Sequence, residues 1–450
     1  MGASLTFELL QKPVGTLDLL LHLLREGKAS VTAILSATGM NKETFYSAAD
    51  RLKTIGFAYE DRQTGYPTYV YWGLTRVGEA FARSLGPAAD MISGTAAALE
   101  QELAALDETN EPATLPRRTE ILDLLTDREF SLGRWDPAEA TARRLVELSG
   151  STSDIPRQIR GRLALGRVYQ KRDRHDDARR ELDEALRLAT SAGRGELAAE
   201  TDYLIGSDLE RQGHWQEALE RFGSSASRAD RAGVALRAAR ARQATARILA
   251  KRGRYHEALG VLREVVADLE GLRAEDDLPR VYVALGSTLH SLDRLDQAGE
   301  WFAKGVEAAQ RVGDIRMEAY GLVYGAAGSI DAGEYRKADQ ALARGGRLFE
   351  DLGEKMGVGS YELNTARLFS LQRRWSEAEE HFDRALAIAR ETSNRYQEAW
   401  ALFNRGQMAK RRERRDEARA LLTEAKRIFT DLGSEARALR CDEELEGLIE

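Results

Sequence analysis

The chain has 450 residues, of which 43% are hydrophobic and 31% are charged, and its formal net charge is −7. This length is too great for one ordinary core and predicts two or three domains. The near balance of basic and acidic residues excludes the strongly basic class of non-specific nucleic-acid binder. Many good helix formers and only 8 prolines predict a mostly helical protein.

Two features indicate where the protein works. The single cysteine, Cys441, cannot form an internal disulfide, which is typical of a reducing compartment. The longest early apolar run, residues 17–24, is too short to cross a bilayer and lacks the layout of a signal peptide. We therefore expect a cytoplasmic protein with no membrane partner.

The first 85 residues predict three helices and a hairpin. Helical patterns cover residues 15–26, 31–37 and 42–55, and residues 57–75 alternate as two strands do. The expected turn and cap residues are Gly39 between helices, Asn41 as N-cap, Gly56 as helix end and Thr64-Gly65 in the hairpin. Another helix is expected from Thr75 to about Ser84.

This order resembles the winged-helix fold of prokaryotic transcription regulators, and YWGLTRVGEAF (71–81) is similar to the last strand and helix of that family. The resemblance covers residues 13–85 and implies that helix 42–55 enters the major groove of DNA. Phe45, Ala49 and Leu52 would form the buried stripe of that helix. The side chains implied to contact DNA, from this helix and the hairpin, are Lys42, Thr44, Tyr46, Ser47, Arg51, Arg62, Gln63 and Tyr66.

The alternative is a winged helix that contacts only protein. Glu43 and Asp50 lie on the predicted reading face. Residues 1–85 carry nine Lys or Arg against eight Asp or Glu, so the net charge of this domain is only +1. Both observations favour the alternative, and the sequence leaves the two functions open.

Residues 86–114 predict an acidic linker helix. Ile92, Ala96, Leu99, Leu103 and Leu106 follow a 4-3-4-3 spacing, which places them on one seam as coiled-coil dimers require. The seam predicts either a homodimer through Ile92–Leu106 or packing onto the chain's own domain. Residues 108–116 are expected to be the linker to the next domain.

From residue 115 onward, one phrase returns every forty residues. Its centre is always Ala, and an apolar residue follows four positions later in seven of eight occurrences, with Ala142 in the first. A small residue recurs twelve positions upstream, and a Gly or polar break lies between. Each unit therefore predicts a helix A, a turn and a helix B that cross closely. The central alanines are Ala138, Ala178, Ala218, Ala258, Ala298, Ala338, Ala378 and Ala418.

This pattern resembles the tetratricopeptide repeat. Residues 165–186, LGRVYQKRDRHDDARRELDEAL, carry that family's Leu-Gly, Tyr, Ala, Leu and Ala landmarks, although the period exceeds the usual value of about 34. The resemblance covers about residues 115–450 and implies a right-handed α solenoid of about eight repeats. The predicted fold class is therefore mainly α, with a winged helix at 1–85, a linker helix at 86–114, a solenoid at 115–432 and a capping helix at 433–450.

Motifs of catalysis are absent from the sequence. It contains no HExxH, no Cys/His cluster, no phosphate-cradling Gly-rich loop and no nucleophile elbow. The segment GVGS at 357–360 is expected to be a turn at a repeat junction. We therefore expect no enzyme activity, no cofactor and no metal.

We number each forty-residue repeat from residue 119, 159, 199 and every fortieth residue onward. The tetratricopeptide resemblance implies that positions 2, 5, 9 and 12 of each repeat face a concave groove. From the fourth repeat onward these positions hold five basic and no acidic residues, which predicts an acidic partner. Asn364 and Asn404 occupy position 6, where family members grip a peptide backbone. The implied groove residues are Arg240, Arg247, Arg280, Tyr320, Asn364, Arg367, Trp400, Phe403, Asn404, Gln407 and Lys410. The alternative is a solvated groove in which Arg stems cover apolar surface.

These features predict a transcription regulator whose winged helix binds double-stranded DNA and whose solenoid binds an acidic peptide or protein segment. The alternative is a scaffold or adaptor in which the winged helix contacts only proteins.

Overall fold

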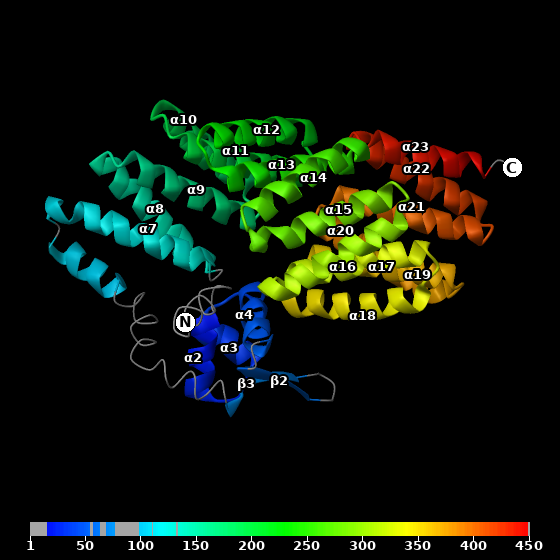
Figure 1. Ribbon diagram of the computed structural model, residues 1–450, viewed down its shortest axis with the longest axis horizontal. Helices are drawn as coiled ribbons and strands as arrows, with labels where there is room; N and C mark the ends of the chain where they lie inside the picture. The colour runs from blue at the N-terminus through cyan, green and yellow to red at the C-terminus, as the bar shows by residue number, and fades with distance from the viewer. Residues whose placement is uncertain are drawn as a thin grey trace. The chain divides into compact units, whose positions relative to one another are not determined.

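The computed structural model describes residues 16–54, 57–63, 69–76, 99–109, 111–131 and 134–448 (Figure 1). The chain forms two compact units, Met1–Leu204 and Ile205–Glu450. In the described ranges, no helix combines the length and the apolar character needed to cross a membrane.

The first unit opens with a small α+β arrangement that is consistent with the expected winged helix. Its sheet is antiparallel with the strand order β1-β3-β2. The short strand β1 was not predicted, because two residues leave no periodic signal; it forms by pairing Ala29 with Trp72 and Ser30 with Tyr71. The elements are α2 (Thr16–Glu26), β1 (Ala29–Ser30), α3 (Val31–Thr38), α4 (Lys42–Thr54), β2 (Ala58–Gln63) and β3 (Tyr69–Leu74).

Local signals in this region act as expected. Gly39 adopts a left-handed φ of 68°, and the Oδ1 atom of Asn41 accepts a hydrogen bond of 2.8 Å from the backbone N–H of Thr44. The predicted stripe of α4, Phe45, Ala49 and Leu52, is fully buried. Gly56 and the Thr64-Gly65 turn lie outside the described residues, as does the helix expected from Thr75 to about Ser84, apart from Thr75 and Arg76.

Eight helix pairs follow, and the described residues confirm the mainly α repeat architecture. A 3-10 turn, η1 (Pro112–Thr114), precedes the first pair. The A helices are α7 (Leu115–Ser131), α9 (Ile155–Lys171), α11 (Gly195–Gln212), α13 (Ala235–Lys251), α15 (Leu278–Ser291, after η2 at Glu275–Asp277), α17 (Ile315–Asp331), α19 (Lys355–Leu371) and α21 (Arg395–Arg411). The B helices are α8 (Trp135–Thr152), α10 (His175–Ser191), α12 (Trp215–Arg231), α14 (Tyr255–Gly271), α16 (Leu295–Val312), α18 (Tyr335–Leu352), α20 (Trp375–Glu391) and α22 (Arg415–Asp431).

Two local expectations were wrong. The linker predicted at 108–116 is shorter, because helix 99–109 includes its first two residues and α7 begins at Leu115, with Pro116 in the first turn where proline is tolerated. The segment GVGS is not a turn but part of α19. Its glycines serve close packing, since a Cβ on Gly357 would overlap the ring of Phe349 and one on Gly359 would lie 2.7 Å from Gln397.

The eight periodic alanines are all fully buried, which explains the forty-residue interval. Small residues at the upstream position let helix B approach: a Cβ added to Gly286 would lie 2.8 Å from the ring of Phe302, and one added to Gly206 would lie 2.9 Å from the ring of Phe222. In seven of the eight repeats, the larger side chain four positions after the alanine can therefore fill the space beside the small upstream residue.

A second period, of twenty residues, appears only in the backbone. From residue 153 to residue 433, every twentieth residue has a positive φ. Glycine occupies eight of these fifteen positions, but Ser153, Asp173, Arg273, Asp293, Arg373, Ser393 and Glu413 occupy the others. Each of these residues ends a helix in the left-handed conformation, so the turns are alike although their residues differ.

The second unit ends with α23 (Glu435–Glu446), which contacts the fourth helix pair as well as α22. The hydroxyl of Ser434 donates a hydrogen bond of 2.6 Å to the carbonyl oxygen of Lys251, the last residue of α13. A Cβ on Gly253, in the turn after α13, would overlap the Cβ of Ala436. Segments 183 residues apart therefore lie in contact, as the red and green helices show in Figure 1.

Candidate functional site

The predicted groove residues lie on the A helices of the second unit. Successive A helices contact one another, as α15 does α17 and α17 does α19, whereas successive B helices contact one another less. The A helices therefore form the inner layer of this unit and the B helices the outer layer.

The aromatic residues of the groove fall into two clusters. The Trp400 and Phe403 rings lie 5.6 Å apart on α21, and Trp400 also packs 5.7 Å from Phe429. Tyr320, on α17, packs 4.8 Å from the ring of Phe349 and 5.5 Å from that of Tyr324. Phe403 is buried, while Trp400 and Tyr320 are half-buried.

The two asparagines stand one repeat apart, and both are buried. The Nδ2 atom of Asn404 donates a hydrogen bond of 2.7 Å to the carbonyl oxygen of Trp400, and that of Asn364 donates one of 3.0 Å to the carbonyl oxygen of Ser360. The Oδ1 atom of Asn364 accepts a bond of 3.2 Å from Arg367. Within the described residues, no donor lies within hydrogen-bond distance of the Oδ1 atom of Asn404.

Most cations of the groove carry acidic partners from a neighbouring helix. Arg247 and Lys251 both pair with Glu210 at 2.8 Å, and Arg240 pairs with Asp277 at 2.8 Å. Arg367 pairs with Asp331 at 2.7 Å, and Lys410 pairs with Glu444 at 2.8 Å, which also accepts a bond from Gln407. Arg280 is exposed. The positive charge expected for the groove is thus largely balanced within the chain.

These pairs explain how the carboxylates titrate. Burial alone would raise the pKa of Glu210, but Lys251 and Arg247 outweigh burial and hold that pKa well below its usual range. Burial would also raise the pKa of Asp331, but His290 and Arg367 outweigh the effect of burial. The pKa of Asp331 is therefore lowered. Both carboxylates are therefore ionised at neutral pH and neutralise the arginines beside them.

The sequence alone did not pair these acids with the basic residues, because each helix was considered separately. Glu210 occupies an inward position of the third repeat, whereas Asp277 and Asp331 lie outside the inward positions. The partners are separated by 36 or 37 residues, as in Arg247 with Glu210, Arg240 with Asp277 and Arg367 with Asp331. That spacing is one repeat minus about one helical turn, which brings the two side chains together on adjacent A helices. A search for opposite charges at this interval would have found them.

The predicted DNA-contacting residues of α4 and the hairpin differ in exposure. Lys42 and Arg62 are exposed, whereas Thr44, Tyr46, Ser47 and Arg51 are half-buried. Arg62 pairs with Glu60, which also pairs with Lys53 at 2.8 Å. Tyr66 and the side chain of Gln63 lie outside the described residues.

The first repeat contacts α2 and the turn after α3 within the first unit. Arg134 donates a hydrogen bond to the carbonyl oxygen of Thr38, and a Cβ on Gly39 would overlap its guanidinium. Arg128, on α7, pairs with Asp18 of α2 at 3.0 Å. The turn that precedes α4 is therefore attached to the first helix pair of the array.

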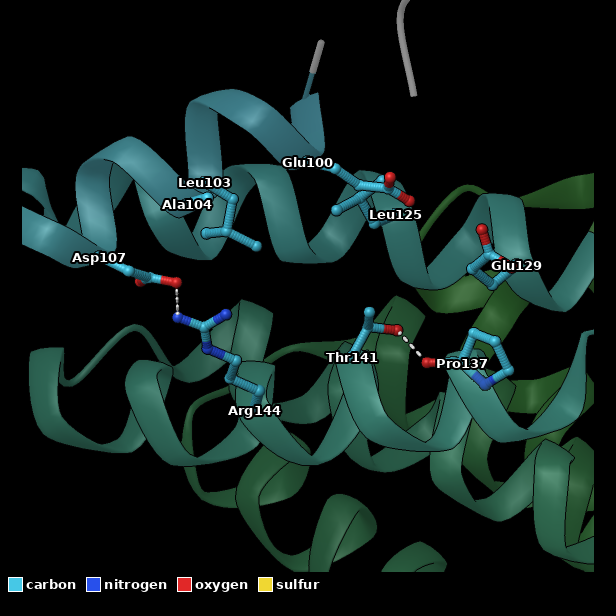
Figure 2. A pocket seen from close by; sticks show the side chains of 9 residues that line it. All are labelled: Glu100, Leu103, Ala104, Asp107, Leu125, Glu129, Pro137, Thr141 and Arg144. Atoms are coloured by element: carbon cyan, nitrogen blue, oxygen red, sulfur yellow. Dashed lines mark hydrogen bonds and ion pairs between the residues drawn. The ribbon is translucent and has the colours of Figure 1, made fainter. Parts of the chain in front are cut away.

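A hollow of about 220 Å³ lies between helix 99–109, α7 and α8 (Figure 2). Leu103, Leu125 and Thr141 line it together with the carboxylates of Glu129 and Asp107, and Asp107 is paired with Arg144. No predicted site residue lies in this hollow. No group of three His, Cys, Asp or Glu residues in the described ranges has the arrangement to hold a metal ion.

Comparisons with known proteins agree with the helix pairs. The tetratricopeptide repeat family matches residues 158–231, 279–311 and 360–431. No curated protein matches the chain.

Several solved structures share the fold. A Rap protein complexed with competence and sporulation factor has a TM-score of 0.51 and 14% identity, over 73% of this chain and 98% of that one. The Rap conjugation gene regulator of the plasmid pLS20, in complex with the Phr* peptide, has a TM-score of 0.52 and 13% identity, over 79% of this chain and 96% of that one. The apo form of the quorum sensor NprR from B. thuringiensis has a TM-score of 0.52 and 16% identity, over 83% of this chain and 97% of that one. The matched segments therefore resemble tetratricopeptide repeats, and the helix pairs share the fold of these solved structures.

Proposed function

We propose that the protein is a peptide-responsive transcription regulator, in which the tetratricopeptide array binds a peptide and the N-terminal domain binds double-stranded DNA. The observation that carries the peptide assignment is the pair Asn364 and Asn404, which stand one repeat apart on the inner layer beside Trp400 and Phe403. Two of the proteins with a similar fold are named as complexes with a signalling factor and with the Phr* peptide.

The geometry also supports a particular way of binding. The free Oδ1 atom of Asn404 can accept a peptide N–H, and the ring pair beside it can pack against an apolar side chain. Because Arg240, Arg247, Arg367 and Lys410 already have acidic partners, any preference for an acidic peptide needs a further cation. The expected ligand is an extended peptide with at least one large apolar residue.

Replacement of Asn404 by Ala should weaken peptide binding by about 1–3 kcal/mol, the scale of one hydrogen bond that is lost from a buried site. The measurement is titration of the full-length chain with peptides selected from a random library. Arg419→Ala, on the exposed face of the outer helix α22, serves as the control. Equal affinity of Asn404→Ala and wild type would contradict the assignment of the groove.

The DNA assignment rests on α4, whose exposed end carries Lys42, and on Arg62 in the hairpin. Contact of Arg134 with the turn before α4 offers a path by which ligand binding in the array could reorient this helix. The second candidate, a domain that contacts only protein, is favoured by Glu60, because its carboxylate partly neutralises Arg62 and Lys53.

Selection from a randomised duplex library separates the two candidates. The double variant Arg51→Ala and Arg62→Ala should weaken duplex binding, and each lost phosphate contact should reduce the slope of log affinity against log salt by about 1. Arg419→Ala should bind as wild type does. Unchanged binding by the double variant at several salt concentrations would remove these residues from the interface, and no binding by wild type would favour the adaptor.

A further inference from the structure

One buried cation beside the groove differs from all those described above. Arg437, on α23, is only 7% exposed. Its guanidinium lies 4.1 Å from the centroid of the Trp400 ring and 5.4 Å from that of Tyr255. Its Nη2 atom donates a long hydrogen bond of 3.3 Å to the hydroxyl of Ser291, and its Nε atom is buried with no acceptor.

Among the residues that the structure describes, no carboxylate pairs with Arg437. Only two arginines are buried in the described part of the chain, and the other, Arg118, pairs with Asp107 at 2.7 Å. The nearby acids of α23 face elsewhere, since Glu444 pairs with Lys410 and Asp442 pairs with Lys426 at 2.6 Å. A buried charge without a counter-ion is costly, and aromatic rings compensate only part of that cost.

The surroundings of Arg437 suit an anion rather than a second cation. Arg440, one helical turn later, lies 5.9 Å from the centroid of the Phe403 ring and is exposed. The hydroxyls of Ser291 and Tyr255 provide polar neighbours, and Trp400 and Phe403 provide apolar ones. A guanidinium edge with a free Nε and a weakly bound Nη2 matches the two oxygens of a carboxylate.

We propose that Arg437 is the carboxylate-recognition residue of the groove and binds an acidic side chain or the C-terminal carboxylate of the peptide. This inference rests on the proposed peptide function and identifies the chemistry of its ligand. The carboxylate takes the partner position that no acid of the described ranges fills. Because Arg437 is buried, entry of the carboxylate requires α23 to shift relative to Trp400.

The test uses the full-length chain and random heptapeptides selected for binding to it. Each selected peptide is resynthesised with its Asp and Glu residues changed to Asn and Gln, and with its C-terminal carboxylate amidated. For wild type, removal of one particular carboxylate should weaken binding at least ten-fold. For Arg437→Gln, the same change should have no effect. An equal loss in wild type and Arg437→Gln would overturn the proposal.

Two further variants control for folding and chemistry. Arg437→Lys keeps the charge but loses the planar fork, so it should retain an intermediate dependence on the carboxylate. Arg419→Gln, on the exposed face of α22, should behave as wild type does. Circular dichroism of each variant reports whether the helices are intact.

A second probe separates this inference from the proposed function. If no heptapeptide binds wild type, the peptide function fails, and the melting temperature in N-acetylglutamate then tests Arg437 alone. A rise in the melting temperature of wild type that is absent in Arg437→Gln supports a carboxylate site. If the melting temperature of wild type does not rise, the proposal is overturned. An equal or larger rise with inorganic phosphate would assign the residue to free anions and overturn recognition of a peptide carboxylate.

Discussion

At the scale of single residues, charge on the inner helices is organised in pairs between repeats. Glu210 is the most enclosed of these acids, since it is 8% exposed and is held by both Arg247 and Lys251. The positions of the basic residues could be predicted from the repeat, because each recurs at a known place on helix A. Their partners could not be predicted from one helix, because the distance between side chains on adjacent helices depends on how the helices pack.

Replacement of Glu210 by Gln should lower the free energy of unfolding at pH 7 by about 1–3 kcal/mol, because its charged hydrogen bonds with Arg247 and Lys251 are weakened or lost. The folded carboxyl has a lower pKa than the unfolded one, so its stabilisation is present above about pH 4.3 and is lost as the pH falls below that value. Urea unfolding at several pH values should show the difference from wild type shrinking in acid. Glu257→Gln, at an exposed acid on α14, is the control. A difference in the free energy of unfolding between Glu210→Gln and wild type that does not change with pH would contradict the role of Glu210.

At the scale of elements, the seam before the array packs on its own chain. Leu103 is 7% exposed and contacts a cluster with Ile121, Leu122 and Leu125, and Leu99 and Leu106 pack at its edge. Of the two predictions for the seam, packing onto the chain's own domain agrees with these contacts. Ile92 and Ala96 lie outside the described residues, so the homodimer stays a prediction. The spacing alone could not choose, because a coiled coil and an intramolecular helix contact require the same apolar stripe.

Replacement of Leu103 by Ala should therefore lower the free energy of unfolding by about 2–3 kcal/mol, since it removes a buried side chain beside the hollow of Figure 2. Leu124→Ala, at a residue that is 52% exposed on α7, should change it by less than about 0.5 kcal/mol. Urea unfolding measures stability, and light scattering measures mass. A halved mass with unchanged stability would show that the seam joins two chains.

At the scale of the whole molecule, α23 contacts the fourth repeat across a sequence separation of 183 residues. Ser434 reaches the end of α13, and Ala436 meets Gly253 in the following turn. A capping helix was expected after residue 433, but the contact with a repeat 183 residues away was not. It depends on the small rotation of each repeat relative to the next, which accumulates along an array and has no counterpart in any single repeat.

Replacement of Ala436 by Leu should loosen this contact, because the larger side chain meets the backbone of Gly253. Overpacking of this kind costs about 1–3 kcal/mol, so the amides of α23 should exchange at least about five-fold faster with solvent deuterium. Leu439→Ala, at an exposed residue of the same helix, is the matched control. Exchange in α23 equal to that of wild type would show that the contact does not hold the helix.

The sequence by itself determined the repeat, its period and the residues that fill its core, because these depend on side chains within one helix pair or its neighbour. The eight alanines and the large residues that follow them were found in this way, and all eight alanines are buried. Only the tertiary structure decided which residues take the left-handed conformation, since Arg373 and Glu413 occupy the same turn position as Gly213 and Gly253. It also decided that Glu210 neutralises Arg247 and that Arg437 has no carboxylate partner among the described residues, because both facts depend on residues brought together by the packing of different repeats.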